Sequence, residues 1–481
     1  MRERKSTCSS SLLLGVTTAL LACALVPAAF AQSQSGLAES AGLAPAGEPR
    51  CFAIVGARII TVSGAPIDKG TVVLKDGIIA AVGTNVSVPR EAAIIDGTGL
   101  TVYPGLIDAG TAVGLPAAEA EQPAARGRGP RSASAAPQKI SLGPQDRPQT
   151  TPWNIAANDL NPADPRVEKW RGAGFTTALV QPTGGIFPGQ GSVVAFGGDR
   201  PGEMVVAPRV TLGIAFDTSG NFANFPTSLM GSIAYVRQVF IDTRWYQDAE
   251  TIYNANHQLE RPPYDRTEAV VGEALNHHEL VLLPANEKLS IYRAIRLANE
   301  WQINAAIYGV QQGYAMANEI AASKLPVFVN VNWPKMEKGA DEDQITLRQL
   351  RFWDRAPSTP SALSKAGVTY AFYSGALSDP KEILKNVKKA IDAGLAPDAA
   401  LKAMTITPAQ ILGVADRLGS IQQGKIANLV VADGDIFTEK TKIKDVFVDG
   451  KRYQIHEEPS SAAPGGPTAS PADATGGEAQ P

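Results

Sequence analysis

Strands and helices alternate along the middle of this 481-residue chain, and this alternation restricts its fold more than any other feature. Strand-like runs at 175–180, 280–283, 303–308, 326–331 and 368–373 each follow a helical stretch. Strands that alternate with helices of roughly 8–15 residues indicate βα units on a parallel sheet. Because the pattern extends over roughly 300 residues, it predicts an α/β fold built on a TIM (β/α)8 barrel.

Short strands and turns flank this region on both sides. Asp76-Gly77 and Asp449-Gly450 each predict a hairpin turn between two such strands. We expect residues 50–103 and 417–456 to pair into one small β-sandwich, with the barrel at 104–416 between them. The stretch 191–264 is less regular, and the pattern does not place barrel strands three and four.

The N-terminus has the features of an export signal. A basic start precedes the apolar run 12–29, and Ala29-Phe30-Ala31 forms a cleavage site. This predicts a signal peptide at 1–31, a linker at 32–49, and a periplasmic or secreted protein without a membrane span after cleavage. A membrane anchor, or a lipoprotein attached at Cys23, is the alternative. Cleavage leaves Cys51 alone, so the mature chain has no intramolecular disulfide.

Two segments have the composition of disordered chain. Residues 117–150 are rich in Pro, Ala, Gly, Arg and Ser, and the tail 457–481 is similar. The insertion's Arg126, Arg128 and Arg131 leave open a role as a binding arm for an acidic partner. The formal net charge of −3 argues against a nucleic-acid partner, which normally requires a concentrated basic face.

Four stretches carry a resemblance to a known family: KDGIIAAVG (75–83), VYPGLIDAGTAVGL (102–115), TPAQILGVADRLGS with its continuation (407–437), and VDGKRY (448–453). In these stretches the chain resembles the amidohydrolase superfamily, close to its imidazolonepropionase-like branch. The resemblance implies a barrel whose Zn²⁺ or similar divalent metal activates water to hydrolyse non-peptide C–N bonds.

The resemblance also identifies where metal ligands would lie. The family has His-x-His at the end of the first barrel strand, a His after strands five and six, and an Asp after strand eight. Here these positions carry Gly110, Ala112, Pro284, Gly309 and Gly375, with Tyr308 and Ser374 as alternative alignments of the last two. Gly, Ala and Pro offer no ligating side chain, so we expect no metal cofactor.

Polar and aromatic residues follow the predicted barrel strands. They have the composition of a recognition pocket for a small molecule. Asp108 is usually present in the family, and we expect it to accept hydrogen bonds from neighbouring loop amides. The predicted pocket residues are Asp108, Gln181, Asn286, Tyr308, Asn330, Asn332, Tyr373 and Ser374.

Two residues are candidate catalytic bases. Glu287 follows strand five, and His257 is the one histidine whose position in the sequence allows it to reach the barrel mouth. His277 and His278 precede a strand, which places them at the N-terminal end of the barrel, whereas TIM-barrel sites lie at the other end.

Three functions remain open. The chain is a catalytically degenerate family member that binds a small ligand or assists an active amidohydrolase paralogue, with a homo-oligomer also open. Alternatively, it is an active hydrolase that uses Glu287 or His257 on a cyclic amide or imide without a metal. The third reading is a structural or envelope-interaction protein that uses the Arg-rich insertion and the tail.

Overall fold

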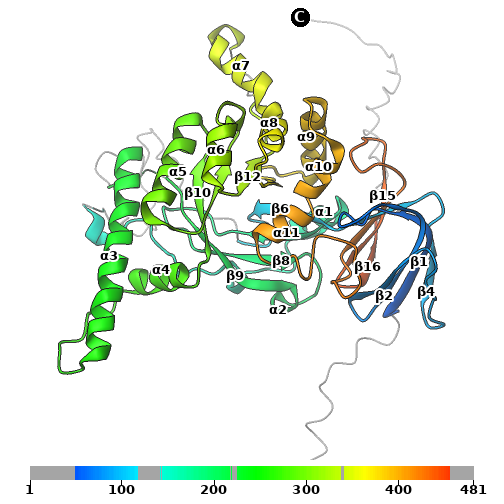
Figure 1. Cartoon of the computed structure of the whole chain (residues 1–481), viewed down its shortest axis with the longest axis horizontal. Helices are drawn as coiled ribbons and strands as arrows, with labels where there is room; N and C mark the ends of the chain where they lie inside the picture. The colour runs from blue at the N-terminus through cyan, green and yellow to red at the C-terminus, as the bar shows by residue number, and fades with distance from the viewer. Residues whose placement is uncertain are drawn as a thin grey trace, which may run out of the picture. The chain divides into compact units, whose positions relative to one another are not determined.

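The computed structural model describes residues 49–116, 141, 143–216, 218, 225–336 and 341–455. Its strands form two eight-stranded sheets, one joined from both ends of the described chain and one from the middle. Figure 1 shows the helices α3 to α11 around the middle sheet, and β1, β2, β15 and β16 in the other. The predicted signal peptide, the linker to residue 48 and the tail from 456 lie outside the described residues.

The first sheet combines the two flanking segments. Its hydrogen-bonded order is β16-β15-β14-β5-β1-β2-β3, and β4 also pairs with β1. The N-terminal and C-terminal parts join where β5 pairs with β14 in antiparallel fashion. The strands are β1 (Cys51–Ile59), β2 (Ile67–Lys75), β3 (Ile78–Gly83), β4 (Ala93–Asp96), β5 (Thr101–Pro104), β14 (Leu429–Ala432), β15 (Ile443–Val448) and β16 (Lys451–Gln454).

Local turn chemistry explains two hairpins of this sheet. Asp76 and Gly77 have φ values of 49° and 83°, and Asp449 and Gly450 have 52° and 75°. Two successive residues with positive φ form the tight turn whose twist matches antiparallel strands, and Asp-Gly is favoured there. Both hairpins predicted from Asp-Gly pairs are therefore confirmed, as β2–β3 and β15–β16.

The second sheet is the predicted barrel. Its order is β13-β12-β11-β10-β9-β8-β7-β6. Within the sheet, β6–β7 and the pairs from β9 to β13 are parallel. The strands are β6 (Leu106–Thr111), β7 (Phe175–Val180), β8 (Gln190–Ala195), β9 (Val205–Gly213), β10 (Leu280–Ala285), β11 (Ala305–Gly309), β12 (Val327–Asn330) and β13 (Tyr370–Tyr373).

One barrel strand departs from the regular (β/α)8 pattern. β8 is antiparallel to both β7 and β9. Residues 181–189, which join β7 to β8, are too few for the crossover of a dozen or more residues that parallel strands need. The structure thus assigns strands three and four to β8 and β9, inside the segment whose pattern is irregular.

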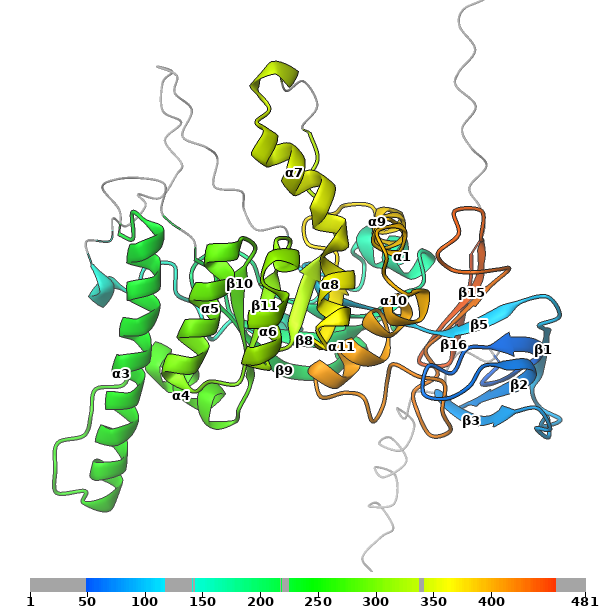
Figure 2. The same ribbon diagram turned by 45° about the horizontal axis from the view of Figure 1, so that its top comes forward.

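Helices cover the outside of the barrel, as Figure 2 shows for α5, α6 and α8. Asp379 caps α9 by accepting a hydrogen bond from the backbone N–H of Lys381. The α-helices are α1 (Pro165–Gly172), α2 (Pro201–Met204), α3 (Leu229–Ala255), α4 (Arg266–Asn276), α5 (Lys288–Trp301), α6 (Ala317–Ser323), α7 (Leu347–Arg355), α8 (Thr359–Lys365), α9 (Pro380–Asp392), α10 (Pro397–Ala403) and α11 (Ile406–Ile411). The 3-10 helices are η1 (Pro144–Asp146), η2 (Ala156–Asn158), η3 (Gly313–Ala315), η4 (Glu342–Gln344) and η5 (Ala356–Ser358).

Apolar side chains fill both sides of the barrel wall. One cluster lies inside the barrel and includes Ile107, Leu179, Leu282 and Phe328. A larger cluster packs the outer faces of the strands against the helices. Strands that are buried on both faces become continuous hydrophobic runs, which is why 175–180 and 280–283 stand out in the sequence.

The described part of the 117–150 insertion corrects the prediction of disorder. Residues 143–150 contain η1, and Arg147 pairs with Asp242, Asp265 and Glu268 at 2.8, 3.5 and 2.5 Å. Composition missed these contacts because the carboxylates come from α3 and from the start of α4, about a hundred residues away. Residues 117–140, with Arg126, Arg128 and Arg131, lie outside the described residues.

No helix within the described ranges is long and apolar enough to cross a membrane. The longest helix, α3, has 27 residues and combines a buried apolar face with charged residues. The predicted apolar signal segment 12–29 is outside the part of the chain that the structure describes, so its fate stays a prediction.

The Arg147 cluster predicts a pH dependence of stability. Burial, and then the charge of Asp265, raises the pKa of Glu268 from 4.5 to about 7. The folded protein therefore binds this proton more tightly than the unfolded chain, so this carboxyl's contribution to stability falls as pH rises from about 4.5 through about 7. In the wild type, this carboxyl should lower the unfolding free energy by about 1–3 kcal/mol as the pH rises from roughly 5 to 8. Glu268→Gln should abolish this decrease, because Gln does not titrate.

Urea unfolding at a series of pH values measures this difference. Glu273→Gln is the matched control, because Glu273 is on the same helix as Glu268 but makes an exposed ion pair with Arg209 of β9. Parallel pH profiles for wild type and Glu268→Gln would contradict the prediction.

Candidate functional site

The predicted pocket residues gather at one end of the barrel. Seven barrel strands run parallel, so their C-terminal ends meet at one rim, and the antiparallel β8 brings its first residue, Gln190, to the same rim. We call this rim the barrel mouth. Residues of the predicted pocket that lie within two residues of a strand end at the mouth are Gln181, Asn286, Tyr308, Asn330, Asn332, Tyr373 and Ser374.

Asp108 lies inside β6 and is 1% exposed. Its Oδ1 accepts hydrogen bonds from the backbone N–H groups of Ser374 (2.9 Å) and Gly110 (3.2 Å). Its Oδ2 accepts one from Trp170 Nε1 at 3.0 Å. Burial raises the pKa of this carboxyl, while its hydrogen bonds act in the opposite direction. Asp108 thus bonds loop amides, as predicted, and joins the first strand, the last strand and α1.

Tyr373 packs directly against Gly110. A Cβ atom at Gly110 would lie 3.2 Å from Tyr373 Cδ2 and 3.4 Å from its Cγ. The Tyr373 ring also meets the Tyr308 ring edge-on, with centroids 6.4 Å apart. The ring therefore occupies the space in front of the position where the family has its first imidazole.

Two phenol groups, those of Tyr373 and Tyr308, lie at the mouth. Burial, and then the neighbouring Tyr308, raises the pKa of Tyr373, with Asp108 acting in the same direction. Tyr308 donates a hydrogen bond from its hydroxyl to the carbonyl oxygen of Ile214 at 3.0 Å. The raised pKa keeps the Tyr373 phenol protonated, and the Tyr308 hydroxyl serves as a hydrogen-bond donor.

Amide side chains hold the loops of the mouth. Asn330 Oδ1 accepts from the backbone N–H of Asn332 at 2.8 Å, and Gln311 Nε2 donates to the carbonyl oxygen of Asn332 at 2.6 Å. Asn286 Oδ1 accepts from the backbone N–H of Gln311 at 3.4 Å. The loops after β10, β11 and β12 are therefore linked to one another.

Gln181 fills the floor between β7, β8 and β9. It donates from Nε2 to the carbonyl oxygen of Gly189 (3.1 Å) and accepts from Thr211 Oγ1 (2.7 Å). A Cβ atom at Gly191 or Gly213 would lie 2.2 or 2.3 Å from the Gln181 amide. These two glycines are required because the Gln181 side chain crosses over them.

The positions that the resemblance aligns with metal ligands lie at the mouth but do not supply ligands. Gly110 and Pro284 are in strands, and Gly309 and Gly375 have φ values of +100° and +61°, which favour glycine. In the ranges that the structure describes, no group of three or more His, Cys, Asp or Glu side chains comes together. A Zn²⁺ site usually takes three or four such ligands, so the described donors do not fit one.

The structure separates the two candidate bases. Glu287 lies at the mouth, exposed, at the N-cap position of α5. His257 follows α3, whose 27 residues span roughly 40 Å from their start on the mouth side. Figure 1 shows that the C-terminal end of α3, which precedes His257, extends past α4 on the side from which the chain enters β10. The structure thus corrects the expectation that His257 reaches the mouth, because the length of α3 was not evident from the sequence.

Sequence reasoning missed two buried residues of the site. Gln190 is 2% exposed, its Nε2 donates to the carbonyl oxygen of Pro152 at 3.0 Å, and its Oε1 has no hydrogen-bond partner among the described residues. Trp170 is 1% exposed and bonds Asp108. Gln190 lies in the Gly-rich run 184–194, which was the available sequence signal. Gln190 reaches the mouth only because β8 runs antiparallel to its neighbours, and the sequence pattern does not reveal that direction.

Comparisons with known proteins agree with this fold. A sequence profile described as the Amidohydrolase family matches residues 357–453. Among solved structures, an amidohydrolase from Thermotoga maritima MSB8 is similar with a TM-score of 0.69 and 26% sequence identity, over 84% of this chain and 100% of that chain. None of the curated proteins matches the sequence.

More distant structures share the fold. A Xaa-Pro dipeptidase with bound methionine in its active site has a TM-score of 0.51 and 16% identity, over 84% of this chain and all of that one. A prolidase complexed with N-methylphosphonate-L-proline has a TM-score of 0.50 and 18% identity, over 84% and 99%. The chain belongs to the amidohydrolase superfamily, a family of hydrolases, and its barrel is of the TIM type.

The hydrogen bonds of Asp108 predict a large effect on stability. Asp108→Ala should lower the unfolding free energy by about 2–4 kcal/mol, because it leaves Trp170 Nε1 and two backbone N–H groups without an acceptor. Asp379→Ala, which removes only the N-cap of α9, should cost about 1 kcal/mol.

Urea denaturation at neutral pH measures both changes. The double variant Asp108→Ala/Trp170→Phe should lose less than the sum of its single variants, because the two side chains share one hydrogen bond. Equal losses for Asp108→Ala and Asp379→Ala would show that Asp108 does not hold the barrel together.

Proposed function

We propose that this chain is an exported amidohydrolase-fold protein that has lost metal-dependent hydrolysis. In this proposal it binds a small neutral ligand at the barrel mouth, or assists an active paralogue as a partner subunit. The observation that carries it is the contact of Tyr373 with Gly110. A side chain at position 110 would need the space that the Tyr373 ring occupies.

The loss extends beyond one position. Gly309 and Gly375 adopt backbone conformations with positive φ, and a Cβ atom at Gly375 would lie 2.7 Å from Asn330 Oδ1. Restoring an imidazole or a carboxylate at either position would strain the backbone or displace a neighbour. Several aligned ligand positions are therefore adapted to small residues, which supports a loss that is not limited to position 110.

The chemistry of the mouth favours an uncharged ligand with amide character. Phenol and carboxamide groups of Tyr308, Tyr373, Asn330 and Gln181 donate and accept hydrogen bonds without a net charge. Such groups complement the N–H and C=O of a cyclic amide or imide, and the aromatic rings supply apolar contact. A charged ligand would lie unpaired against these groups, apart from Glu287 at the rim.

Export rests on the N-terminal pattern alone. The basic start, the apolar run and the Ala29-Phe30-Ala31 motif support a periplasmic or secreted location. The sequence of the purified protein's N-terminus, beginning at Gln32, would establish cleavage.

A second candidate function is hydrolysis without a metal. Glu287 favours it, because this carboxylate is the one predicted base that lies at the mouth. Water has a pKa near 15.7, so the carboxylate would have to remove its proton as water attacks the ligand carbonyl. Glu287 is exposed, whereas bases of this kind are usually partly desolvated, and we therefore rank this function second.

Metal content and ligand binding test the first proposal. Protein expressed in zinc- and manganese-supplemented medium should contain well under one metal ion per chain by elemental analysis. In a thermal-shift panel of cyclic amides and imides, a binder should lose at least tenfold in affinity in Asn330→Ala. Asn276→Ala is the matched control, because Asn276 ends α4, just before the chain enters the opposite end of the barrel. Stoichiometric metal at the mouth would overturn the proposal.

Turnover tests the second function. If the chain hydrolyses any member of the panel, Glu287→Gln should reduce kcat at least a hundredfold, whereas the exposed Glu319→Gln on α6 should leave it unchanged. Unchanged turnover in Glu287→Gln would reject Glu287 as the base.

A further inference from the structure

Residues 147–154 run between the outer helices and the loop that joins β7 to β8, and we call this segment the strap. On its outer side, Arg147 forms ion pairs with three carboxylates of α3 and the start of α4, those of Asp242, Asp265 and Glu268. In Figure 2 the cyan η1, which Arg147 directly follows, lies beside α3. The Arg147 side chain is 20% exposed and that of Glu268 is 9% exposed, so solvent screens this pair only weakly.

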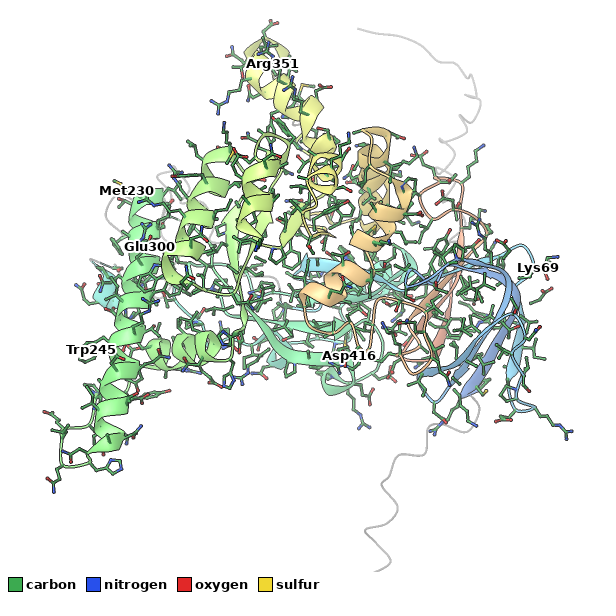
Figure 3. The ribbon with its side chains drawn as sticks, viewed as in Figure 1. Lys69, Met230, Trp245, Glu300, Arg351 and Asp416 are labelled. Atoms are coloured by element: carbon green, nitrogen blue, oxygen red, sulfur yellow. The ribbon has the colours of Figure 1, made fainter. Side chains whose placement is uncertain are left out.

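α3 meets the strap along the edge of its buried face. Figure 3 shows Met230 and Trp245 on the side of α3 that faces away from the barrel, where they are 80% and 62% exposed. Asp242 lies between them in the sequence, and its side chain is 27% exposed. The hydroxyl groups of Thr150 and Tyr235, a buried residue of the same helix, lie 2.6 Å apart. The strap is therefore joined to α3 at two positions.

The backbone of the strap adopts a conformation that its own sequence disfavours. Arg147 and Gln149 have φ values of 47° and 52°, in the left-handed region that few residues other than glycine adopt. Arg147 also precedes Pro148, and the residue before a proline favours extended backbone. Such conformations persist only where surrounding contacts fix them. The ion pairs of Arg147 supply those contacts at the first of the two positions.

The inner side of the strap bonds the β7–β8 loop. The carbonyl oxygen of Gln149 accepts hydrogen bonds from the backbone N–H groups of Ile186 (2.8 Å) and Phe187 (3.2 Å). The carbonyl oxygen of Asn154 accepts one from the backbone N–H of Gln190 at 2.7 Å. The two ends of the strap therefore hold two separate parts of the loop, and the second part is next to the mouth.

Gly189 connects the strap to Gln181. A Cβ atom at Gly189 would lie 2.3 Å from the carbonyl oxygen of Asn154, so the strap packs directly on this glycine. The carbonyl oxygen of Gly189 in turn accepts hydrogen bonds from Gln181 Nε2 (3.1 Å) and from the backbone N–H of Gly213 (2.9 Å). The position of the strap therefore fixes the carbonyl group that orients the Gln181 carboxamide.

We propose that Arg147 is a positioning residue of the barrel mouth. Its ion pairs hold the strap, the strap holds the Gly189 carbonyl, and that carbonyl orients Gln181 for a bound ligand. This inference rests on the function proposed for the mouth, where Gln181 is one of the groups that bond the ligand. A guanidinium suits the role, because its planar fork of five N–H donors can bond several carboxylates at once.

Hydrogen exchange of the full chain, followed by mass spectrometry, tests the positioning without any ligand. Arg147→Met should raise the exchange rates of the three loop amides that donate to the strap at least tenfold. It should also raise the rate at Gly213, whose amide bonds the Gly189 carbonyl rather than the strap. Arg147→Lys keeps the charge without the fork, and should restore part of the protection.

Arg452→Met is the matched control. Arg452 pairs with the buried Asp445 of the first sheet through two bonds of 2.8 and 3.0 Å, and its side chain is 28% exposed, close to the value for Arg147. This variant should lower overall stability without changing exchange in the β7–β8 loop. Asp242→Asn removes one of the three ion pairs of Arg147, so it should give a smaller increase and serves if Arg147→Met does not fold.

Calorimetric titration with succinimide, a cyclic imide, and 2-pyrrolidone, a cyclic amide, tests the consequence at the mouth. Arg147→Met should bind the compound that wild type binds at least tenfold more weakly. In a Gln181→Met background the same substitution should cause little further loss, because Arg147 acts through Gln181. Equal losses in both backgrounds would overturn the positioning role.

The exchange experiment separates a failure of this inference from a failure of the proposed function. Wild-type exchange rates in Arg147→Met, in the loop and at Gly213, would overturn the inference whether or not the compounds bind. Faster exchange in the loop alone would also overturn it, since the strap would then not act on the mouth. If wild type binds neither compound while Gly213 is exposed by Arg147→Met, the ligand class proposed for the mouth is wrong and the role of Arg147 stands.

Discussion

The closure of the barrel depends on the carboxylate of Asp108. The hydrogen-bonded path of the sheet runs from β6 to β13, and Asp108 joins its two ends by bonding Ser374 after β13 as well as Gly110 within β6. Its second oxygen bonds Trp170 on α1. A buried carboxylate is costly unless its acceptors are used, and here three donors use them. One side chain thus bonds the first barrel strand, the end of the last strand and a covering helix.

That closure also shapes the mouth. Tyr373 directly precedes Ser374, so the bond from Ser374 to Asp108 places the Tyr373 ring over Gly110. The ring then meets Tyr308, and the neighbouring loops are linked through Asn330, Asn332 and Gln311. The same contacts that close the barrel therefore line its rim with phenol and carboxamide side chains.

Much of the fold could be predicted because its signals are local. Buried strands produce apolar runs, and Asp-Gly pairs favour the positive φ values of hairpin turns, so β7, β10 and both hairpins were found. The reversed β8 was not, since strand direction depends on partners rather than on composition. The ion pairs of Arg147 and the distance of His257 from the mouth were missed because they depend on α3 and α4, elsewhere in the chain.

By itself the sequence determined the βα pattern, the superfamily resemblance and the residue types available at the mouth. Small residues at the aligned positions were evident from Gly110, Ala112 and Pro284 alone. Only the tertiary structure decided that Tyr373 occupies the space beside Gly110, and that the outer face of α3 is left without a partner in the described chain. The physical reason is that a residue's type and spacing are local properties, whereas the space it fills and the surface it leaves exposed depend on the packing of distant segments.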